Sequence, residues 1–299
     1  MSQPTPDGRR MLVVHAHPDD ETIGTGVTMA RYVSEGVAVT LLTCTRGEEG
    51  EILVPELEHL GAAREDRLGE HREDELAKAM AVLGVTDHRV LGGAGRWRDS
   101  GMMGLPTNDR PDAFWRADLL EASTDVCAVV REVRPQVLLT YDTNGGYGHP
   151  DHIQAHRVAT YGTALAAAPA FRPDLGPAWD VPKVYWGAVP RSMLEKGLEE
   201  LAKAGKTALF GVESADELPF TVDDSVVTAV VDAVQLEPLK MAALREHRSQ
   251  VALDGPFFEM ADVIGPEAFG HEYFSLVKGT PGPHRNEEGW ETDLFDGLG

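Results

Sequence analysis

Residues 11–24, MLVVHAHPDDETIG, join a short apolar run to a dense cluster of titratable side chains. Four apolar residues come first, and the next seven positions, HAHPDDE, hold two histidines and three carboxylates. Placing carboxylates together at the end of a buried strand is costly, because they repel one another and lose their hydration. A bound cation would offset that cost, so this stretch predicts a buried strand that ends at a metal site.

Short apolar segments alternate with helical ones through the first half of the chain. The apolar segments are rich in Val and Leu and nearly continuous, which is typical of parallel strands covered on both faces. The alternation predicts an α/β fold, a Rossmann-like doubly wound and mostly parallel sheet. The predicted strands are 11–17, 37–45, 88–93 and 136–142, and the predicted helices are 24–36, 63–85 and 117–135.

The pattern changes after residue 170, where the Pro-rich connector FRPDLGPAWDVP begins. Beyond it we expect a strand at 183–189, a helix at 192–204, a strand within 225–233 and a helix near 235–250. The last twenty residues are acidic and rich in Gly and Pro, which favours a flexible tail. The predicted domains are a Rossmann-like catalytic domain at 9–170, a smaller C-terminal α/β subdomain at 171–280 that completes the cleft, and a flexible acidic tail at 281–299.

The composition limits the partners of this protein. With 49 acidic and 27 basic residues the formal charge is −22, so nucleic acid and anionic membrane surfaces are not expected partners. The N-terminal apolar run is too short for a signal peptide, and no stretch approaches the roughly 18 apolar residues of a membrane span. Cys44 and Cys127 lie in apolar surroundings, typical of buried thiols in a reducing cytoplasm, where we expect the protein to reside. No expectation of oligomeric state follows from the sequence.

Two polar clusters fall where a doubly wound sheet binds its ligands, beyond the carboxyl ends of strands. HAHPDDE follows the first predicted strand and YDTNGGYGHPDH follows the fourth. Two imidazoles and one carboxylate leave a coordination position open for water, which is the pattern of a catalytic zinc site, although ferrous iron also suits it. A His-Pro-Asp turn alone could serve only as a helix cap. The candidate ligands are His17, Asp19, Asp20, His149, Asp151 and His152, and reach alone does not choose between the two neighbouring aspartates.

HAHPDDE (15–21) and GGYGHPDH (145–152) together resemble the LmbE-like family of zinc-dependent N-acetylglucosaminyl de-N-acetylases. Three further segments, TCTRGEEGE (43–51), GGAGRWRDSGM (92–102) and EYFSLVKG (272–279), resemble the branch that deacetylates N-acetylglucosaminyl-inositol in mycothiol biosynthesis. The resemblance covers most of the chain. It implies a small-molecule amino-sugar inositol substrate and a hydrolase that releases acetate from it.

The resemblance also implies roles for individual residues. The metal ligands would be His17, Asp20 and His152, holding one Zn²⁺, or Fe²⁺, per chain. Asp19 would be the general base, with His149 and Tyr147 at the reacting carbonyl.

For the substrate, the resemblance implies that Arg72 and Asp99 hold sugar hydroxyls and that Glu51 faces the inositol. From the residues alone, Arg72 would instead be an exposed helix arginine paired with Asp74 or Glu75.

Three other functions compete with this interpretation, and the first is that of another LmbE-like sugar N-deacetylase. The sister branch of the family cleaves mycothiol S-conjugates, and it typically carries a lysine shortly after the first motif, where this chain has Thr22, Ile23 and Gly24. A non-catalytic nucleotide-binding Rossmann module would need a glycine-rich turn directly after the first strand. Here Gly24 and Gly26 come too late, and acidic residues stand where a pyrophosphate would bind.

Overall fold

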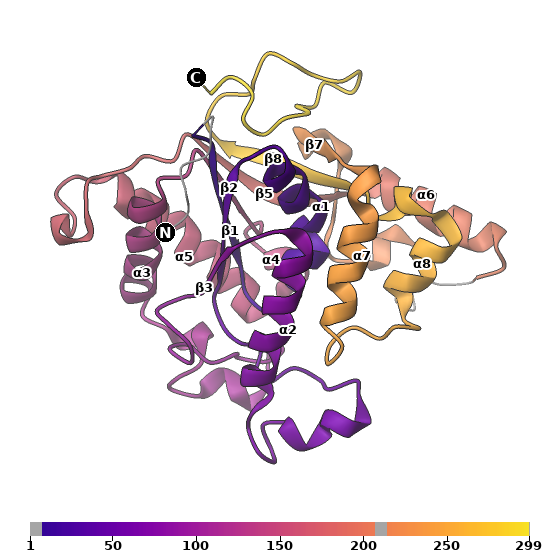
Figure 1. Cartoon of the computed structure of the whole chain (residues 1–299), viewed down its shortest axis with the longest axis horizontal. Coiled ribbons are helices and arrows are strands. Elements are labelled where there is room, and N and C mark those ends of the chain that lie inside the picture. The colour runs from indigo at the N-terminus through magenta and orange to yellow at the C-terminus, as the bar shows by residue number, and fades with distance from the viewer. Residues whose placement is uncertain (1–7, 207–213, 299) are drawn as a thin grey trace.

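The computed structural model describes residues 8–206 and 214–298. In this part of the chain one eight-stranded sheet has the order β3-β2-β1-β4-β5-β8-β7, and β6 pairs with β5 (Figure 1). The strands are β1 (Arg10–His15), β2 (Ala38–Thr43), β3 (Asp87–Val90), β4 (Val137–Thr140), β5 (Lys183–Pro190), β6 (Thr221–Val222), β7 (Ala229–Asp232) and β8 (His271–Lys278).

The strands from β3 to β5 run parallel, whereas β8 is antiparallel to both β5 and β7. The chain builds outward from β1 to β3 on one side and then returns to place β4 on the other side of β1. The strand order therefore reverses between β1 and β4, and such a switch point is where doubly wound sheets bind ligands. The prediction of a Rossmann-like, mostly parallel sheet is confirmed.

Both faces of the sheet are covered by helices because β1 is apolar at every position from 11 to 14. Met11 and Val13 pack in a core with α1, α2 and α7, while Leu12 and Val14 pack in a second core with α3 and α5 on the opposite face (Figure 1). The helices are α1 (Asp20–Ser34), α2 (Leu68–Leu83), α3 (Leu119–Val133), α4 (Gly145–Gly148), α5 (Pro150–Ala167), α6 (Arg191–Lys203), α7 (Glu237–Glu246) and α8 (Pro256–Ile264). Short 3₁₀ helices lie at Pro55–Leu60, Pro106–Asp109, Phe114–Arg116, Pro173–Leu175, Ala215–Glu217, Asp224–Val226, Val234–Leu236 and Pro266–Ala268.

The first helix begins earlier in the structure than the sequence pattern predicts. The sequence pattern begins that helix at residue 24, but α1 begins at Asp20, so the acidic motif itself forms the first turn. Carboxylates are favoured there, because the first turn of a helix exposes backbone N–H groups and the positive end of the helix dipole.

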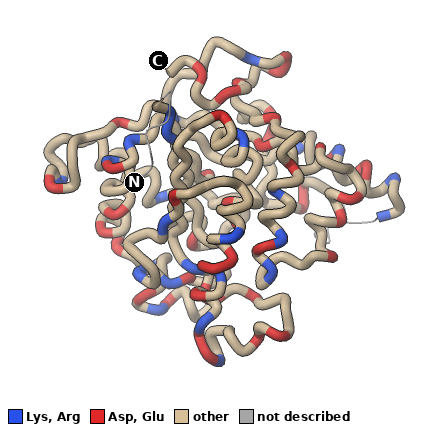
Figure 2. The backbone as a smooth tube through the Cα atoms, viewed as in Figure 1, with Lys and Arg blue, Asp and Glu red and all other residues tan. Residues whose placement is uncertain are grey.

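The described residues after 170 do not build a sheet of their own. Their strands β5, β8 and β7 continue the sheet that β1 to β4 begin, and α6 adds a small apolar cluster beside them. The domain boundary at 170 stays a prediction. Among the described residues, none of the helices has the length and apolar character that crossing a membrane requires. Acidic residues are distributed along the described backbone rather than gathered on one element (Figure 2).

The expected flexible tail is wrong for residues 281–298, which pack against the sheet beyond the start of β5 (Figure 1). Glu291 is fully buried and accepts hydrogen bonds from Lys183 Nζ at 2.6 Å and from the Tyr185 hydroxyl at 3.0 Å. Leu294 and Phe295 enter the core on the α1 side. The tail is ordered because these apolar side chains and one buried carboxylate find partners in residues remote in the sequence.

Replacing Glu291 with alanine is expected to lower the free energy of unfolding by about 3–5 kcal/mol, because it leaves the buried Lys183 ammonium without its counter-charge. Chemical denaturation followed by circular dichroism measures this loss. Glu287, which is exposed in the same tail, supplies the control, and its alanine variant is expected to unfold like the wild type. Equal stability of the two variants would contradict the packed tail.

Candidate metal centre and active site

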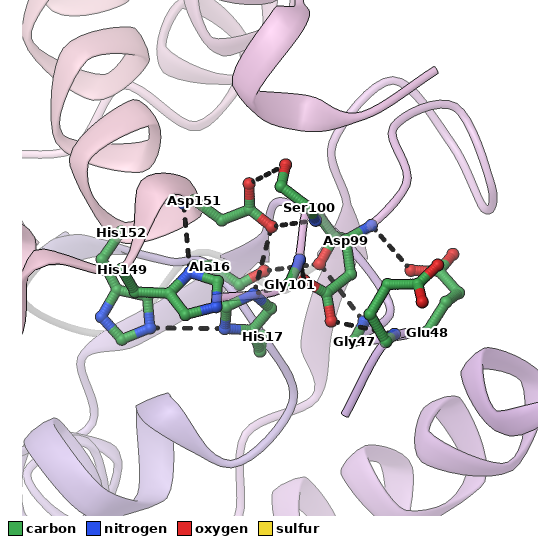
Figure 3. Close-up of polar contacts among 12 residues, drawn as sticks. Ala16, His17, Gly47, Glu48, Asp99, Ser100, Gly101, His149, Asp151 and His152 are labelled. Atoms are coloured by element: carbon green, nitrogen blue, oxygen red, sulfur yellow. Dashed lines mark hydrogen bonds and ion pairs between the residues drawn. The ribbon is translucent and has the colours of Figure 1, made fainter. Parts of the chain in front are cut away.

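Two loops at the switch point carry the polar residues of the site. The first runs from the end of β1 into α1, and the second runs from the end of β4 through α4 into α5. Parallel neighbouring strands present their carboxyl ends at the same edge of the sheet, so segments about 130 residues apart meet there. Figure 3 shows His17 from the first loop beside His149, Asp151 and His152 from the second.

Three side-chain atoms form a nearly equilateral triangle. His17 Nδ1 lies 3.3 Å from Asp20 Oδ2, His152 Nε2 lies 3.3 Å from the same oxygen, and the two nitrogens lie 3.3 Å apart. A cation coordinated tetrahedrally at about 2.0–2.2 Å holds its ligand atoms about 3.3–3.6 Å apart. The spacing therefore fits a four-coordinate divalent cation with one position left for a ligand from outside the protein.

The other ring nitrogen of each histidine faces an acceptor. His17 Nε2 lies 3.3 Å from Asp151 Oδ2 and 3.5 Å from Asp99 Oδ1 (Figure 3). His152 Nδ1 lies 3.1 Å from the Gly145 carbonyl oxygen. Such acceptors place the ring proton on the remote nitrogen and keep the lone pair of the other nitrogen available for a metal. His17 and His152 are thus both oriented as metal-binding histidines are.

Two other groups of side chains at this edge have metal-like spacing, His17 with His149 and His152, and His17 with Asp99 and Asp151. In both, part of the donor set is already engaged. Asp151 accepts from the Ser100 backbone N–H and hydroxyl, and His149 Nδ1 accepts from the Asp151 backbone N–H at 3.1 Å. In the triangle Asp20 Oδ2 also accepts from the His17 backbone N–H at 2.9 Å, but each ring nitrogen of His17 and His152 keeps one clear role, so the triangle fits a cation better.

Asp19 has a strained backbone next to this triangle. Its φ is 117°, in the region that favours glycine, and it stands at the N-cap of α1. Arg72 Nη2 donates to its Oδ2 at 3.1 Å. Burial raises the pKa of the Asp19 carboxyl to about 6, and the Arg72 guanidinium opposes that rise. Asp20 differs: burial alone would raise its pKa, but His152 and His17 hold it well below the usual range.

Arg72 is buried, so the prediction from the residues alone, an exposed helix arginine paired with Asp74 or Glu75, is wrong. Its guanidinium donates to Asp19 and to the carbonyl oxygens of Pro18 and Gly47. Position 47, in the loop after β2, requires glycine, because φ there is +68° and a Cβ would lie 1.9 Å from Arg72 Nη1. Arg72 therefore ties the loop after β2 to the loop after β1.

The other two residues expected to contact substrate lie in different environments. Asp99 is buried, and its carboxylate accepts from the backbone N–H of Gly101 at 2.8 Å (Figure 3) and from that of Glu49 at 3.1 Å. Glu51 is exposed in the loop after β2. The structure thus brings Asp99 against His17 and leaves Glu51 at the surface, and their contacts with a substrate stay predictions.

His149 and Tyr147 both lie beside the triangle. Because His149 Nδ1 accepts a backbone hydrogen bond, its Nε2 is the nitrogen that can donate. Burial, with His17 and His152 nearby, lowers the pKa of His149 to about 3. The side chain of Tyr147 is 43% exposed, and its ring centroid lies 5.0 Å from that of His152. Gly145 permits this arrangement, since a Cβ there would lie 2.5 Å from the His152 Cβ.

Sequence reasoning missed several buried groups around the site. Tyr141 stacks on His152 with ring centroids 4.4 Å apart, and its hydroxyl accepts from the Ala16 backbone N–H at 2.9 Å. His156 is also buried, with Nδ1 3.0 Å from the Tyr141 carbonyl oxygen. Tyr141 lies within the second motif, so its place in the sequence was a usable signal. No local pattern marks His247, which is fully buried beside Glu21.

A doubly wound sheet with a His/Asp cluster of metal-like spacing at its switch point is typical of an α/β enzyme with a metal site. A family model described as PIG-L, GlcNAc-PI de-N-acetylase, matches residues 12–161. The chain belongs to this family, which confirms the LmbE-like resemblance, and it is an N-deacetylase.

Similar proteins cover nearly the whole chain. A 1D-myo-inositol 2-acetamido-2-deoxy-alpha-D-glucopyranoside deacetylase of Geodermatophilus obscurus is 60% identical over 291 residues, covering 97% of this chain and 98% of the relative. A protein of the same name, numbered 1, from Catenulispora acidiphila is 56% identical, covering 97% and 90%. The solved N,N'-diacetylchitobiose deacetylase of Pyrococcus horikoshii has a TM-score of 0.60 at 19% identity, covering 91% and 84%, and this likeness shows the fold alone.

Proposed function

We propose that this enzyme hydrolyses the N-acetyl amide of N-acetylglucosaminyl-inositol in the cytoplasm, releasing acetate and glucosaminyl-inositol for mycothiol biosynthesis. The observation that carries the proposal is the 60% identity, over 97% of the chain, to a relative named for deacetylation of this amino-sugar inositol. The ligand triangle at the switch point supports the hydrolytic chemistry, because its spacing suits a cation with an open position.

The metal ligands in this proposal are His17, Asp20 and His152, which hold one Zn²⁺ per chain, with Fe²⁺ as the other cation that suits the set. When bound, the cation polarises the acetyl carbonyl and lowers the pKa of water towards ~7. The buried acceptors at Asp151 and Gly145 fix the two rings in the orientation that this role requires.

Asp19 is the proton shuttle. Arg72 engages its Oδ2, which leaves Oδ1 to take the proton of the attacking water. The water oxygen then forms the new bond to the acetyl carbon, and the carbon–nitrogen bond breaks. Asp19 passes its proton to the departing amine nitrogen, so the products are acetate and a free amino sugar.

His149 and Tyr147 stabilise the charge that builds on the carbonyl oxygen. The backbone hydrogen bond to His149 Nδ1 directs its Nε2–H into the site, so a neutral imidazole can serve as the donor. The Tyr147 hydroxyl is a second donor, on a side chain open to the substrate. The main role of Arg72 in this proposal is to hold Asp19. The proposal also includes contacts of Arg72, Asp99 and Glu51 with the substrate.

The substrate is tested with three compounds: N-acetylglucosaminyl-inositol, free N-acetylglucosamine and a mycothiol S-conjugate. Released amine is measured with metal-free and zinc-reconstituted protein. We expect the reconstituted enzyme to prefer the inositol compound over the free sugar by at least about tenfold in kcat/KM, because the inositol half contributes binding energy. Faster cleavage of the S-conjugate would instead identify the amidase activity.

A further inference from the structure

Glu21 and His247 form a buried pair next to Asp19, although 226 positions separate them in the sequence. Both side chains are fully buried. Glu21 lies in the first turn of α1, and His247 follows the last residue of α7. His247 Nε2 lies 2.9 Å from Glu21 Oε1, and the Thr22 hydroxyl donates to the same oxygen at 2.5 Å.

The second oxygen of Glu21 holds the backbone of Asp19. Glu21 Oε2 accepts from the Asp19 backbone N–H at 2.9 Å. Asp19 has the positive φ of 117°, and a strained conformation of this kind persists only where its surroundings hold it in place. Glu21 provides that restraint from the backbone side, while Arg72 restrains the Asp19 carboxylate from the other side.

The segment that carries His247 reaches the second restraint as well. Ser249 donates from its backbone N–H at 2.8 Å and from its hydroxyl at 2.6 Å to Glu75, which lies one helical turn after Arg72 on α2. Residues 247–249 thus connect to both sides of Asp19, through Glu21 and through the helix that bears Arg72. Neither His247 nor Ser249 contacts the ligand triangle in the described contacts.

We infer that Glu21 and His247 are a positioning pair that holds Asp19 in its catalytic conformation through the Glu21–Asp19 backbone hydrogen bond. This inference rests on the proposed function, in which Asp19 moves the proton. His247 supplies the donor that keeps the buried Glu21 carboxylate paired and fixed. Without that donor Glu21 reorients and the Asp19 N–H loses its acceptor. The Asp19 carboxylate then moves away from the reacting atoms.

The inference is tested with His247→Phe, which removes the donor, and His247→Gln, which keeps one. Because a misplacement of about 1 Å can cost about 100-fold in rate, we expect His247→Phe to lower kcat by about 10–100-fold. KM is expected to stay within about twofold of wild type and zinc content at one per chain, because the pair contacts neither substrate nor metal ligand side chains. His247→Gln is expected to recover most of the lost kcat. If His247→Phe does not fold, Thr22→Val replaces it in the test. This nearly isosteric change removes the hydroxyl that donates to Glu21 Oε1, so it is expected to lower kcat in the same way.

Lys240→Met is the matched control. Lys240 also lies on α7, and it pairs at 2.7 Å with the buried Glu272, which accepts from the backbone N–H groups of Val27 and Thr28 in α1. This variant breaks a buried ion pair between α7 and the β8 residue Glu272, which in turn holds the α1 backbone, and it does not touch Asp19. It is expected to lower the thermal unfolding midpoint and to keep kcat near the wild-type value.

Three outcomes overturn the inference in an active wild-type enzyme. These are an unchanged kcat in His247→Phe, no recovery in His247→Gln, or an equal loss of kcat in Lys240→Met, which would reveal general loosening of the α1–α7 packing. Absence of amine release by the zinc-loaded wild type would instead reject the proposed function, so the two failures are distinguishable.

Discussion

Replacing Asp19 with asparagine is expected to lower kcat by about 10²–10⁴-fold and to leave one metal ion bound per chain. Asparagine keeps the size of the side chain, tolerates a positive φ and still offers Arg72 an acceptor oxygen, but it cannot take a proton at neutral pH. The loss therefore reports the missing base rather than a collapsed loop. Released acetate and zinc content, measured on the same preparation, check both halves of the expectation.

The matching variant for this experiment is Asp19→Ala, which also removes the Arg72 contact. If Asp19 acts only through Arg72, alanine will be far slower than asparagine; if it is the base, the two variants will be similarly slow. An asparagine variant with near-normal turnover and full metal content would remove Asp19 from the mechanism.

Replacing His152 with alanine is expected to abolish stoichiometric metal binding and, with it, amine release. Changing a residue that only supports a ligand typically costs about 10–100-fold in metal affinity, so removal of a ligand should cost more. Metal analysis after dialysis measures the loss. In the wild type, treatment with a chelator is expected to remove activity, and added Zn²⁺ or Fe²⁺ is expected to restore it according to which ion the site uses.

Two neighbouring histidines, His149 at the start of α5 and His156 within it, serve as controls for the His152 variant. His156 is buried one turn after His152 and bonds to the Tyr141 carbonyl oxygen, so His156→Ala should keep its metal. His149→Ala should also keep the metal and lose kcat, because its Nδ1 caps α5 and its Nε2 serves the substrate in our proposal. Loss of metal from His149→Ala, with retention in an Asp20→Ala variant, would favour the group of three histidines instead.

Much of the catalytic edge could be predicted because its information is local. The apolar runs that become β1 and β4 determine where strands end, and the histidines and aspartates that follow them must then meet at one edge. The expected ligands His17, Asp20 and His152 do come together, with their donor atoms 3.3 Å apart. The residues alone did not separate Asp19 from Asp20, since both follow the same strand, and the family resemblance supplied the choice of Asp20. In the structure the two differ in backbone conformation, with a positive φ at Asp19.

The sequence by itself determined the alternation of strands and helices and placed the two motifs after the first and fourth predicted strands, because each depends on neighbouring residues. The strand order that makes this edge a switch point came from the structure. Tertiary structure alone decided that Arg72, His247 and Glu291 are buried. Arg72 looks like a surface residue on its own helix, His247 has no pattern around it, and Glu291 stands in an acidic tail, yet all three are buried against partners remote in the chain. A charged side chain is buried only where a distant partner offsets its lost hydration, and that partner is not encoded in the residues beside it.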